Sequence, residues 1–497
     1  MSSAAPPRAL QPVLTTLVGM WALLQAFGNL AAANVNADEP VYVTAGWAYV
    51  HGDFSANVEH PPTAKLLMGV AQVIFGQGVL SARVAAGLCA IAGGILLYVW
   101  LRPEVGWVGA LCGAGAWLLL PHGVTSGVRI DRFGLLNPFM VVFAIAAFAA
   151  GWRWFRRRSW GWLCVSAVCM GLSITSKVPS AVMIPAIILS PLLERPTRPV
   201  AGRLRTVLVS ALVYSAIVAV VVVVVYLPAG LAHSLGEMIR FQLAHDEAGH
   251  LVVVGGVATT HPPWWANLLF SVEGMGLPAA TVLAVGAVAA FFGADRALPT
   301  LLVGAVLLEW MFQFAVSSVA LPHYYYDWVW LFCVLFGVGT AALLRIGCRD
   351  GPAGGGHTVA RALVAASVVV ALGSAAWTTV AIANERARDM ALVLPTLDRL
   401  GVGSGGILVA GMAEWEYQPY LDGREVTTPG TPGVVAVATK ESLRFPIDPA
   451  VRALIDAPAS RFRRLELDDV TLYVDEHAAI SPETSRPSGS PGSGSPR

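Results

Sequence analysis

Charged residues are scarce in this chain. Asp, Glu, Lys and Arg make up 13% of its 497 residues, where a typical soluble domain has about 25%. Hydrophobic residues reach 56%, so a soluble globular protein is excluded and a polytopic membrane protein is predicted. The formal net charge of +1 gives no broad positive surface, which excludes nucleic acid as a partner.

Cysteine and lysine are scarce as well. The six cysteines lie in or beside apolar stretches without the paired spacing of a zinc site, which favours small buried side chains over disulfides or metal ligands. Lysine occurs only at Lys65, Lys177 and Lys440. Two of these positions, Lys65 and Lys177, lie at predicted membrane edges. Either this is chance, or a compact and flexible ammonium group is needed at both places.

Long apolar runs, in contrast, are abundant. A membrane-spanning helix needs about 20 apolar residues, and eleven segments approach this length: 13–33, 82–101, 107–123, 135–153, 160–176, 178–193, 206–227, 274–293, 298–318, 325–345 and 359–383. Residues 41–80 are apolar but interrupted by Pro61-Pro62 and three glycines, which predicts short amphipathic helices on the membrane surface. The predicted fold is an all-α polytopic membrane protein with about eleven transmembrane helices plus interfacial helices.

The arginines predict the orientation in the membrane. They cluster on alternate loops, and positively charged loops face the cytoplasm. Loops 34–81, 124–134, 228–270 and 319–324 and the chain after residue 383 are then extracytoplasmic. The predicted location is the cell membrane, with the polar motifs together on the outer face. A cleaved signal peptide ending near Ala31-Ala32-Ala33 is the alternative for the first apolar run.

The chain changes character after the last apolar run. Residues 407–410, 434–438 and 470–474 read as short strands, and 386–400 and 449–457 as helices. We therefore predict three parts: a transmembrane domain (1–383), a small extracytoplasmic α/β domain (384–480) and a disordered Ser/Pro/Gly-rich tail (481–497).

The first polar motif is Asp38-Glu39, at the exit of the first apolar run. Charged residues beside a membrane segment are costly, so they indicate a functional site. Pro40 favours a helix that starts here and runs to about Val50. Adjacent helical residues point about 100° apart, so we predict Asp38 as the reacting carboxylate and Glu39 as its support. The alternative is that both acids only stabilise the helix dipole.

The second motif is Glu59-His60-Pro61-Pro62-Thr63-Ala64-Lys65. Its Pro-Pro pair predicts a rigid turn, and Lys65 falls about one turn into the helix that follows. Lys177 lies where two apolar runs meet on the same predicted face. For both lysines the alternative is an amine that reaches from the apolar region to the lipid headgroups.

Two further loops on that face carry polar groups. In Arg129-Ile130-Asp131-Arg132 an arginine can bind a phosphate through two hydrogen bonds while Asp131 orders the cluster; a solvated ion pair is the alternative. Loop 228–270 contains Gln242, His245 and His250, whose spacing matches no zinc site, so hydrogen bonding to a phosphate or a sugar is favoured. The segment His323-Tyr324-Tyr325-Tyr326-Asp327 is predicted to be structural.

In these motifs the chain resembles the GT-C superfamily of membrane glycosyltransferases, in particular the protein O-mannosyltransferases (glycosyltransferase family 39) and the lipid A aminoarabinose transferases. The protein mannosyltransferases have an Asp-Glu after the first span and a later His-Pro-Pro-x-x-Lys, which match Asp38-Glu39 and His60 to Lys65. The Arg-x-Asp at Arg129 to Asp131 matches their second motif, and Lys177 matches a lysine after the fifth span. The resemblance covers about residues 13–345.

The resemblance implies transfer of a sugar from a polyprenyl-phosphate donor to an extracytoplasmic hydroxyl of a glycan, a lipid or a protein. The local chemistry suits this reaction, because cations near the departing phosphate stabilise the charge that develops there. The expected roles are as follows: catalytic carboxylates Asp38, Glu39 and Asp131, with Asp38 as the base; donor phosphate ligands Lys65, Lys177, Arg129 and His60; and acceptor or donor contacts Glu59, Gln242, His245 and His250. No metal ligand or cofactor is assigned, and assistance by a divalent metal ion is left open.

Two other classes of function remain as alternatives. A transporter of a lipid-linked or small anionic substrate would place polar residues in broken helices near mid-bilayer, often in internal repeats. Here the titratable groups lie at one edge, and no repeat is evident. A structural membrane protein with a receptor-like outer domain is the other alternative. The sequence identifies neither the sugar nor the acceptor.

Overall fold

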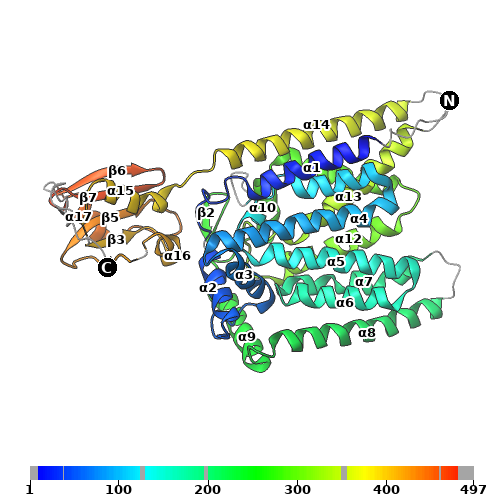
Figure 1. The fold of residues 1–497 in the computed structure, drawn as a ribbon, viewed down its shortest axis with the longest axis horizontal. Coiled ribbons are helices and arrows are strands. Elements are labelled where there is room, and N and C mark those ends of the chain that lie inside the picture. The colour runs from blue at the N-terminus through cyan, green and yellow to red at the C-terminus, as the bar shows by residue number, and fades with distance from the viewer. Residues whose placement is uncertain are drawn as a thin grey trace, which may run out of the picture. The chain divides into compact units, whose positions relative to one another are not determined.

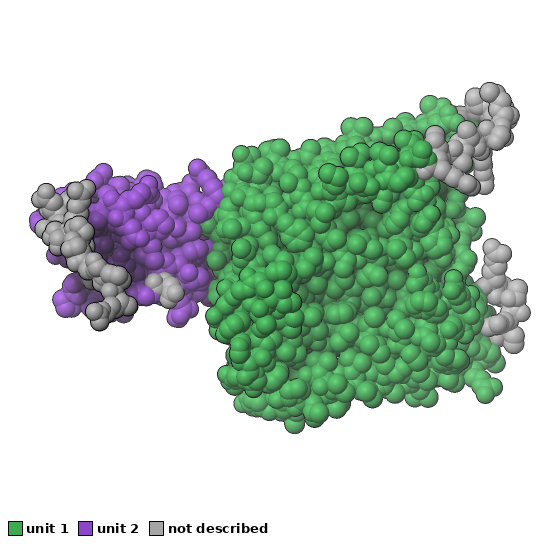
Figure 2. All heavy atoms as spheres, in the orientation of Figure 1, with its two compact units in different colours: residues 1–385 green, residues 386–497 purple. Residues whose placement is uncertain are grey.

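The computed structural model describes residues 9–36, 38–123, 129–194, 200–348, 355–403, 405–421, 423–457 and 461–478. The chain forms two compact units, residues 1–385 and 386–497 (Figures 1 and 2). The tail predicted to be disordered, 481–497, lies outside the described residues.

The first unit is a bundle of helices (Figure 1). Its α-helices are α1 (Leu10–Phe27), α2 (Glu39–Val50), α3 (Pro62–Phe75), α4 (Val79–Leu119), α5 (Leu136–Arg157), α6 (Trp160–Ile174), α7 (Ile184–Leu189), α8 (Val200–Tyr226), α9 (Leu231–Ala248), α10 (Ala266–Met275), α11 (Leu277–Ala289), α12 (Ala297–Met311), α13 (Tyr326–Gly347) and α14 (Gly355–Ala383). Short 3-10 helices and a two-stranded hairpin, β1 (Val252–Val254) and β2 (Val257–Thr259), connect them.

Among the described residues, seven helices are long and apolar enough to cross a membrane, or eight if the α10–α11 pair, bent by 108°, is one broken span. Each of the eleven predicted apolar segments is largely helical, but the segments do not all form separate long helices. Segments 82–101 and 107–123 form one 41-residue helix, α4, with a kink at Gly106 where φ is 82°. Segments 160–176 and 178–193 form shorter helices. The multi-pass fold is confirmed, and the number of spans stays a prediction.

Helix α13 lies at the centre of the bundle. In α5 and in α13 the most apolar stretch is 78% buried, whereas in α8 it is 17% buried. Gly109 of α4 and Gly337 of α13 let the two helices approach closely. If Gly109 carried a Cβ atom, that atom would lie only 2.8 Å from the carbonyl oxygen of Gly337, which is too close for a side chain. Without a hydrophobic driving force between helices in lipid, such close backbone packing is a main source of association.

The predicted short helices of residues 41–80 are α2 and α3. Prolines stand in the first turn of both helices, where a missing N–H costs nothing. The two helices touch through glycines, since a Cβ on Gly46 would lie 2.5 Å from the carbonyl oxygen of Lys65, and a Cβ on Gly69 would meet the carbonyl of Gly46. This contact places the Asp38 and His60 motifs side by side.

The second unit is a small α/β domain, as predicted. Its five strands are β3 (Gly406–Ala410), β4 (Val426–Thr427), β5 (Val434–Lys440), β6 (Phe462–Leu467) and β7 (Val470–Asp475), in the order β4-β3-β5-β7-β6. β3 runs parallel to β4 and β5, and the β5–β7 and β7–β6 pairs are antiparallel. The helices include α15 (Val393–Arg399), α16 (Glu414–Tyr417) and α17 (Pro449–Ile455). The sequence analysis missed β4, which is only two residues long, and β6, which is mostly polar.

Substitution of Gly69 by alanine should destabilise the first unit. The added Cβ would meet the Gly46 backbone and lie 2.7 Å from Val50 Cγ1, and overpacking of this kind costs about 1–3 kcal/mol. We expect a lower melting temperature of the purified protein in detergent. Gly19→Ala is the matched control, because nothing lies within 4 Å of its added Cβ. Equal melting temperatures for the two variants would contradict the close packing of α2 and α3.

Candidate active site

Several distant chain segments line one cavity of about 340 Å³ in the first unit. Figure 1 shows α2, α3 and α9 gathered at the same end of this unit. The lining residues are Asp38, Val41, Tyr42, Asn57, Glu59, His60, Pro61, Leu136, Asn137, Lys177, Val178, Pro179, Met238, Phe241, Gln242, His245, His250, Val319, Leu321, His323 and Tyr324. The structure therefore brings together Asp38, Glu59, His60, Lys177, Gln242, His245 and His250 from the predicted site residues.

The two acids of the first motif point to different places. Asp38, just before α2, is half-buried and lines the cavity. Glu39 is fully buried away from it and accepts hydrogen bonds from Arg83 and from the backbone N–H groups of Asn36 and Gly134, at 2.7–2.8 Å. The helical spacing predicted this divergence. Glu39 is thus placed to support Asp38 and not to meet a substrate.

Arg83 is an important residue that the sequence analysis missed. Besides its ion pair with Glu39, its guanidinium donates to the carbonyl oxygens of Leu30 and Ala33, at 3.0 and 2.9 Å, and of Asn34, at 2.9 Å. One buried side chain therefore fixes the backbone of residues 30–34, between α1 and Asp38. The available signal was a lone arginine within the second apolar run.

Lys65 does not line the cavity, and its predicted contact with the donor phosphate stays a prediction. Its ammonium group is fully buried and donates to the Tyr49 hydroxyl and the His60 carbonyl oxygen, both at 2.8 Å, and to the Asn57 carbonyl. Burial lowers the pKa of Lys65 to about 7, although the charge of Glu59 opposes this. Lys65 instead holds the loop that carries Glu59 and His60.

That loop places an ionised carboxylate in the cavity wall. Asn57 Nδ2 donates to Glu59 Oε1 at 2.7 Å and lies 3.3 Å from His60 Nδ1. The neighbouring His60 side chain lowers the pKa of Glu59 to about 2, against the effect of burial. Glu59 is therefore a permanent hydrogen-bond acceptor at neutral pH.

Lys177 supplies the cavity with a positive charge. Its ammonium donates to Asp327 Oδ2 at 2.9 Å, lies 4.2 Å from the centre of the Tyr324 ring and is 14% exposed. Asp327 is fully buried and also accepts a hydrogen bond from Asn137 at 2.6 Å. The segment that we expected to be structural therefore contributes to the site, because Tyr324 lines the cavity and Asp327 holds Lys177.

Arg129 and Asp131 form an internal pair outside the cavity. Arg129 Nε donates to Asp131 Oδ1 at 2.9 Å, and the guanidinium also bonds the carbonyls of Leu120 and Trp117. Both side chains are at most 2% exposed, and Tyr326 donates to Asp131 at 3.2 Å. Burial raises the pKa of Asp131, but the charge of Arg129 outweighs this and keeps it low. The pair orders the chain just before α5, and its predicted roles as phosphate ligand and catalytic acid stay predictions.

The α9 side of the cavity is a row of rings. His60 lies 5.3 Å from Phe241, Phe241 lies 4.2 Å from His245, and His245 lies 5.6 Å from His250, between ring centres. His323 also lines the cavity; burial, with the charges of Lys177 and His250, lowers its pKa to about 3, so its ring is neutral. Among the described residues no three His, Cys, Asp or Glu side chains form a group able to hold a metal ion. Assistance by a divalent ion thus stays an expectation.

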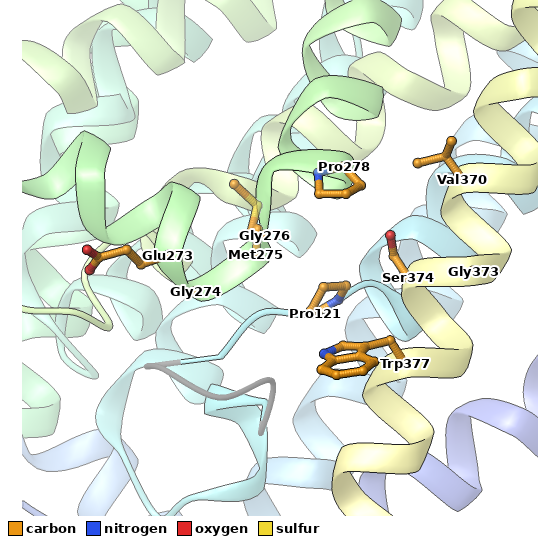
Figure 3. Close-up of a pocket in the computed structure, with 10 residues that line it drawn as sticks. All are labelled: Pro121, Glu273, Gly274, Met275, Gly276, Pro278, Val370, Gly373, Ser374 and Trp377. Atoms are coloured by element: carbon orange, nitrogen blue, oxygen red, sulfur yellow. The ribbon is translucent and has the colours of Figure 1, made fainter.

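A second cavity, of about 660 Å³, lies between the α10–α11 bend and α14 (Figure 3). Met275, Pro278, Val370 and Trp377 give it largely apolar walls. In Figure 3 the carboxylate of Glu273 points away from the Trp377 ring. None of the predicted site residues lines this cavity.

Comparison with known sequences points to one family. The family described as dolichyl-phosphate-mannose-protein mannosyltransferase matches residues 59–227. A polyprenol-phosphate-mannose–protein mannosyltransferase of Mycolicibacterium smegmatis is 28% identical over 149 residues. That match covers 28% of this chain and 28% of the relative, so the chain aligns with less than a third of the relative's length.

Comparison with solved structures shows the fold. ArnT from Cupriavidus metallidurans, bound to undecaprenyl phosphate, superposes with a TM-score of 0.60 at 15% identity, covering 94% of this chain and 99% of that chain. The apo oligosaccharyltransferase of Archaeoglobus fulgidus gives a TM-score of 0.52 at 11% identity, covering 87% and 70%. The chain therefore has the fold of the GT-C membrane glycosyltransferases, and it resembles the protein O-mannosyltransferases and the lipid A aminoarabinose transferases.

Proposed function

We propose that this protein is a membrane glycosyltransferase that moves a sugar from a polyprenyl-phosphate donor to an extracytoplasmic hydroxyl group of a glycan, a lipid or a protein. The observation that carries the proposal is the cavity itself. Asp38 and Lys177 come from distant parts of the chain and both line it. The mannosyltransferase match over 59–227 and the fold shared with undecaprenyl phosphate-bound ArnT support it.

The chemistry that the cavity suits is a single displacement. The bond between the sugar C1 and the phosphate oxygen breaks, and its electron pair stays on the phosphate. The acceptor oxygen forms a bond to C1 from the opposite face, which inverts the anomeric configuration. The phosphate leaves as an anion, so the reaction needs no general acid, only a base for the acceptor proton and a cation for the phosphate.

Asp38 is the base in this proposal. Asp38 lines the cavity and directly precedes α2, whose first residue, Glu39, is held by Arg83. A positioned base must reach the hydroxyl proton within hydrogen-bond distance, which a rigid helix start allows. Glu59, Gln242 and His245 line the same cavity and are placed to hydrogen-bond sugar or acceptor hydroxyls.

Lys177 is the cation in this proposal. Its amine contacts both the cavity and the buried Asp327 carboxylate, so its position is fixed before the donor binds. Preorganised charge of this kind stabilises the developing phosphate anion without reorganisation during the reaction. His60 is the second candidate ligand of the phosphate, since it also lines the cavity, between Tyr42 of α2 and Phe241 of α9.

The polyprenyl chain needs an apolar surface. The cavity between the α10–α11 bend and α14 has the apolar walls that an isoprenoid chain requires (Figure 3). It belongs to the same unit as the polar cavity, and its walls come from apolar helices. We assign it to the lipid part of the donor or the acceptor.

Asp38→Asn should abolish most of the sugar transfer. Loss of a general base lowers turnover by about 10²–10⁴-fold, while binding of the lipid-linked donor should change little. The measurement is transfer from radiolabelled polyprenyl-phosphate sugar by the purified enzyme in proteoliposomes. Asp53→Asn is the control, because Asp53 is exposed in the loop after α2 and does not line the cavity. Undiminished turnover of Asp38→Asn would exclude Asp38 as the base, and movement of label across the bilayer without transfer would indicate a transporter.

Lys177→Met should reduce both activity and stability, for separate reasons. Removal of a preorganised charge costs about 10²–10³-fold in turnover, and the buried Asp327 left alone costs about 3–5 kcal/mol of stability. Adding Asp327→Asn to Lys177→Met also removes the unpaired negative charge of Asp327. The double variant should therefore regain its melting temperature and remain inactive. Recovery of transfer in the double variant would show that Lys177 acts only through folding.

A further inference from the structure

The first unit contains another polar cavity, far from the one described above. It has a volume of about 330 Å³ and is lined by Trp100, Pro103, Glu104, Arg153, Arg156, Arg157 and Trp162. These residues come from the kinked part of α4, the last turns of α5 and the first turn of α6. Leu136, at the start of the 22-residue helix α5, lines the candidate active site. Because such a helix is about 33 Å long, the two cavities lie at opposite ends of the membrane bundle.

This cavity, which we call the arginine pocket, is strongly positive. Three guanidinium groups line it against one carboxylate, that of Glu104. Arg156 forms an ion pair with Asp295 at 2.9 Å, and Arg153 lies 4.8 Å from the centre of the Trp162 ring. Among the described residues, the side chains of Arg153 and Arg157 have no hydrogen bond or ion pair with a protein group; Arg157 is exposed and Arg153 is partly buried. Their donors are therefore available to a bound anion.

A second observation in the pocket points to a ligand. Trp100 is 1% exposed, and its indole N–H has no acceptor among the residues that the structure describes. A buried donor without a partner costs about 1–3 kcal/mol, and buried polar groups in native proteins nearly always have one. An acceptor oxygen placed in the pocket would remove this cost.

The arginines have a simpler explanation, which accounts for only part of the pocket. Basic side chains in a last helical turn complement the negative end of the helix dipole, and α5 ends with Arg156 and Arg157. That effect requires neither a cavity nor a buried tryptophan N–H without an acceptor in its wall. It also does not explain why Glu104 and Arg153 line the same space.

We propose that the arginine pocket binds the phosphate headgroup of an anionic membrane lipid. Guanidinium groups bind phosphate oxygens through paired, charge-assisted hydrogen bonds, and basic pockets between membrane helices bind anionic headgroups. The pocket lies at the ends of apolar helices, where headgroups are found. Arg153 and Arg157 bind the phosphate, Trp100 donates to one of its oxygens, and Glu104 accepts from a headgroup hydroxyl. The site is independent of the proposed glycosyl transfer.

The test measures lipid binding to the full-length, delipidated protein by native mass spectrometry. The probes are dioleoylphosphatidylglycerol and dioleoylphosphatidylcholine, and inorganic phosphate is the soluble competitor. We expect one tightly held phosphatidylglycerol, with phosphatidylcholine held more weakly. The Arg153→Gln/Arg157→Gln variant should bind phosphatidylglycerol at least about tenfold more weakly, because two charge-assisted contacts are lost. Trp100→Phe should show a smaller decrease in the same direction.

Arg102→Gln is the matched control, since Arg102 is an exposed arginine of α4 that does not line the pocket. The melting temperature without added lipid checks the fold of each variant, and the single variants Arg153→Gln and Arg157→Gln replace the double one if it does not fold. Phosphatidylglycerol binding that all variants retain would overturn the proposal. Binding of inorganic phosphate without preference for phosphatidylglycerol would also overturn it, in favour of a soluble anion.

Discussion

The buried ion pair between Arg83 and Glu39 is the interaction on which the candidate active site depends. Arg83 is 3% exposed and Glu39 is fully buried, and together they tie α4 to the start of α2 and to the chain before it. Breaking a buried pair by removing one partner costs about 3–5 kcal/mol. The position of Asp38 follows from this pair, because Asp38 directly precedes Glu39 on the same helix start.

The same principle recurs around the cavity. Three cations at or near the cavity have acceptors close by: Lys65 has two carbonyls and a hydroxyl, Lys177 has Asp327, and Arg129 has Asp131. A charge in a low-dielectric interior is tolerated only when it is paired and hydrogen-bonded. Of these three cations, only Lys177 also lines the cavity. Lys65 and Arg129 instead hold nearby loops in place. Of the three cations, Lys177 alone is therefore placed to contact a substrate.

Much of the fold could be predicted from the sequence, because the length of an apolar run and the period of a strand are local properties. The helices and the strands β3, β5 and β7 lie close to their predicted positions. The site was predicted in part. Asp38, Lys177 and His245 do share a cavity, since each stands at the same end of the predicted bundle. The directions of Lys65 and Arg129 could not be predicted, because these depend on acceptors such as the Asn57 and Leu120 carbonyls. Arg83 was missed since its partner Glu39 is 44 residues away in the chain.

The long helix α4 joins the two ends of the membrane unit. Arg83, near its start, anchors the chain before Asp38, and Trp100, before the kink, lines the arginine pocket. The 17 residue steps from Arg83 to Trp100 correspond to about 26 Å along a helix axis, which is close to the thickness of the hydrocarbon layer, about 30 Å. This part of α4 therefore separates Arg83 from the arginine pocket by about the thickness of one hydrocarbon layer. A much thinner or thicker membrane would have to be met by tilt of this helix or by local deformation of the lipid, and the chain before Asp38 is attached to the same helix through Arg83.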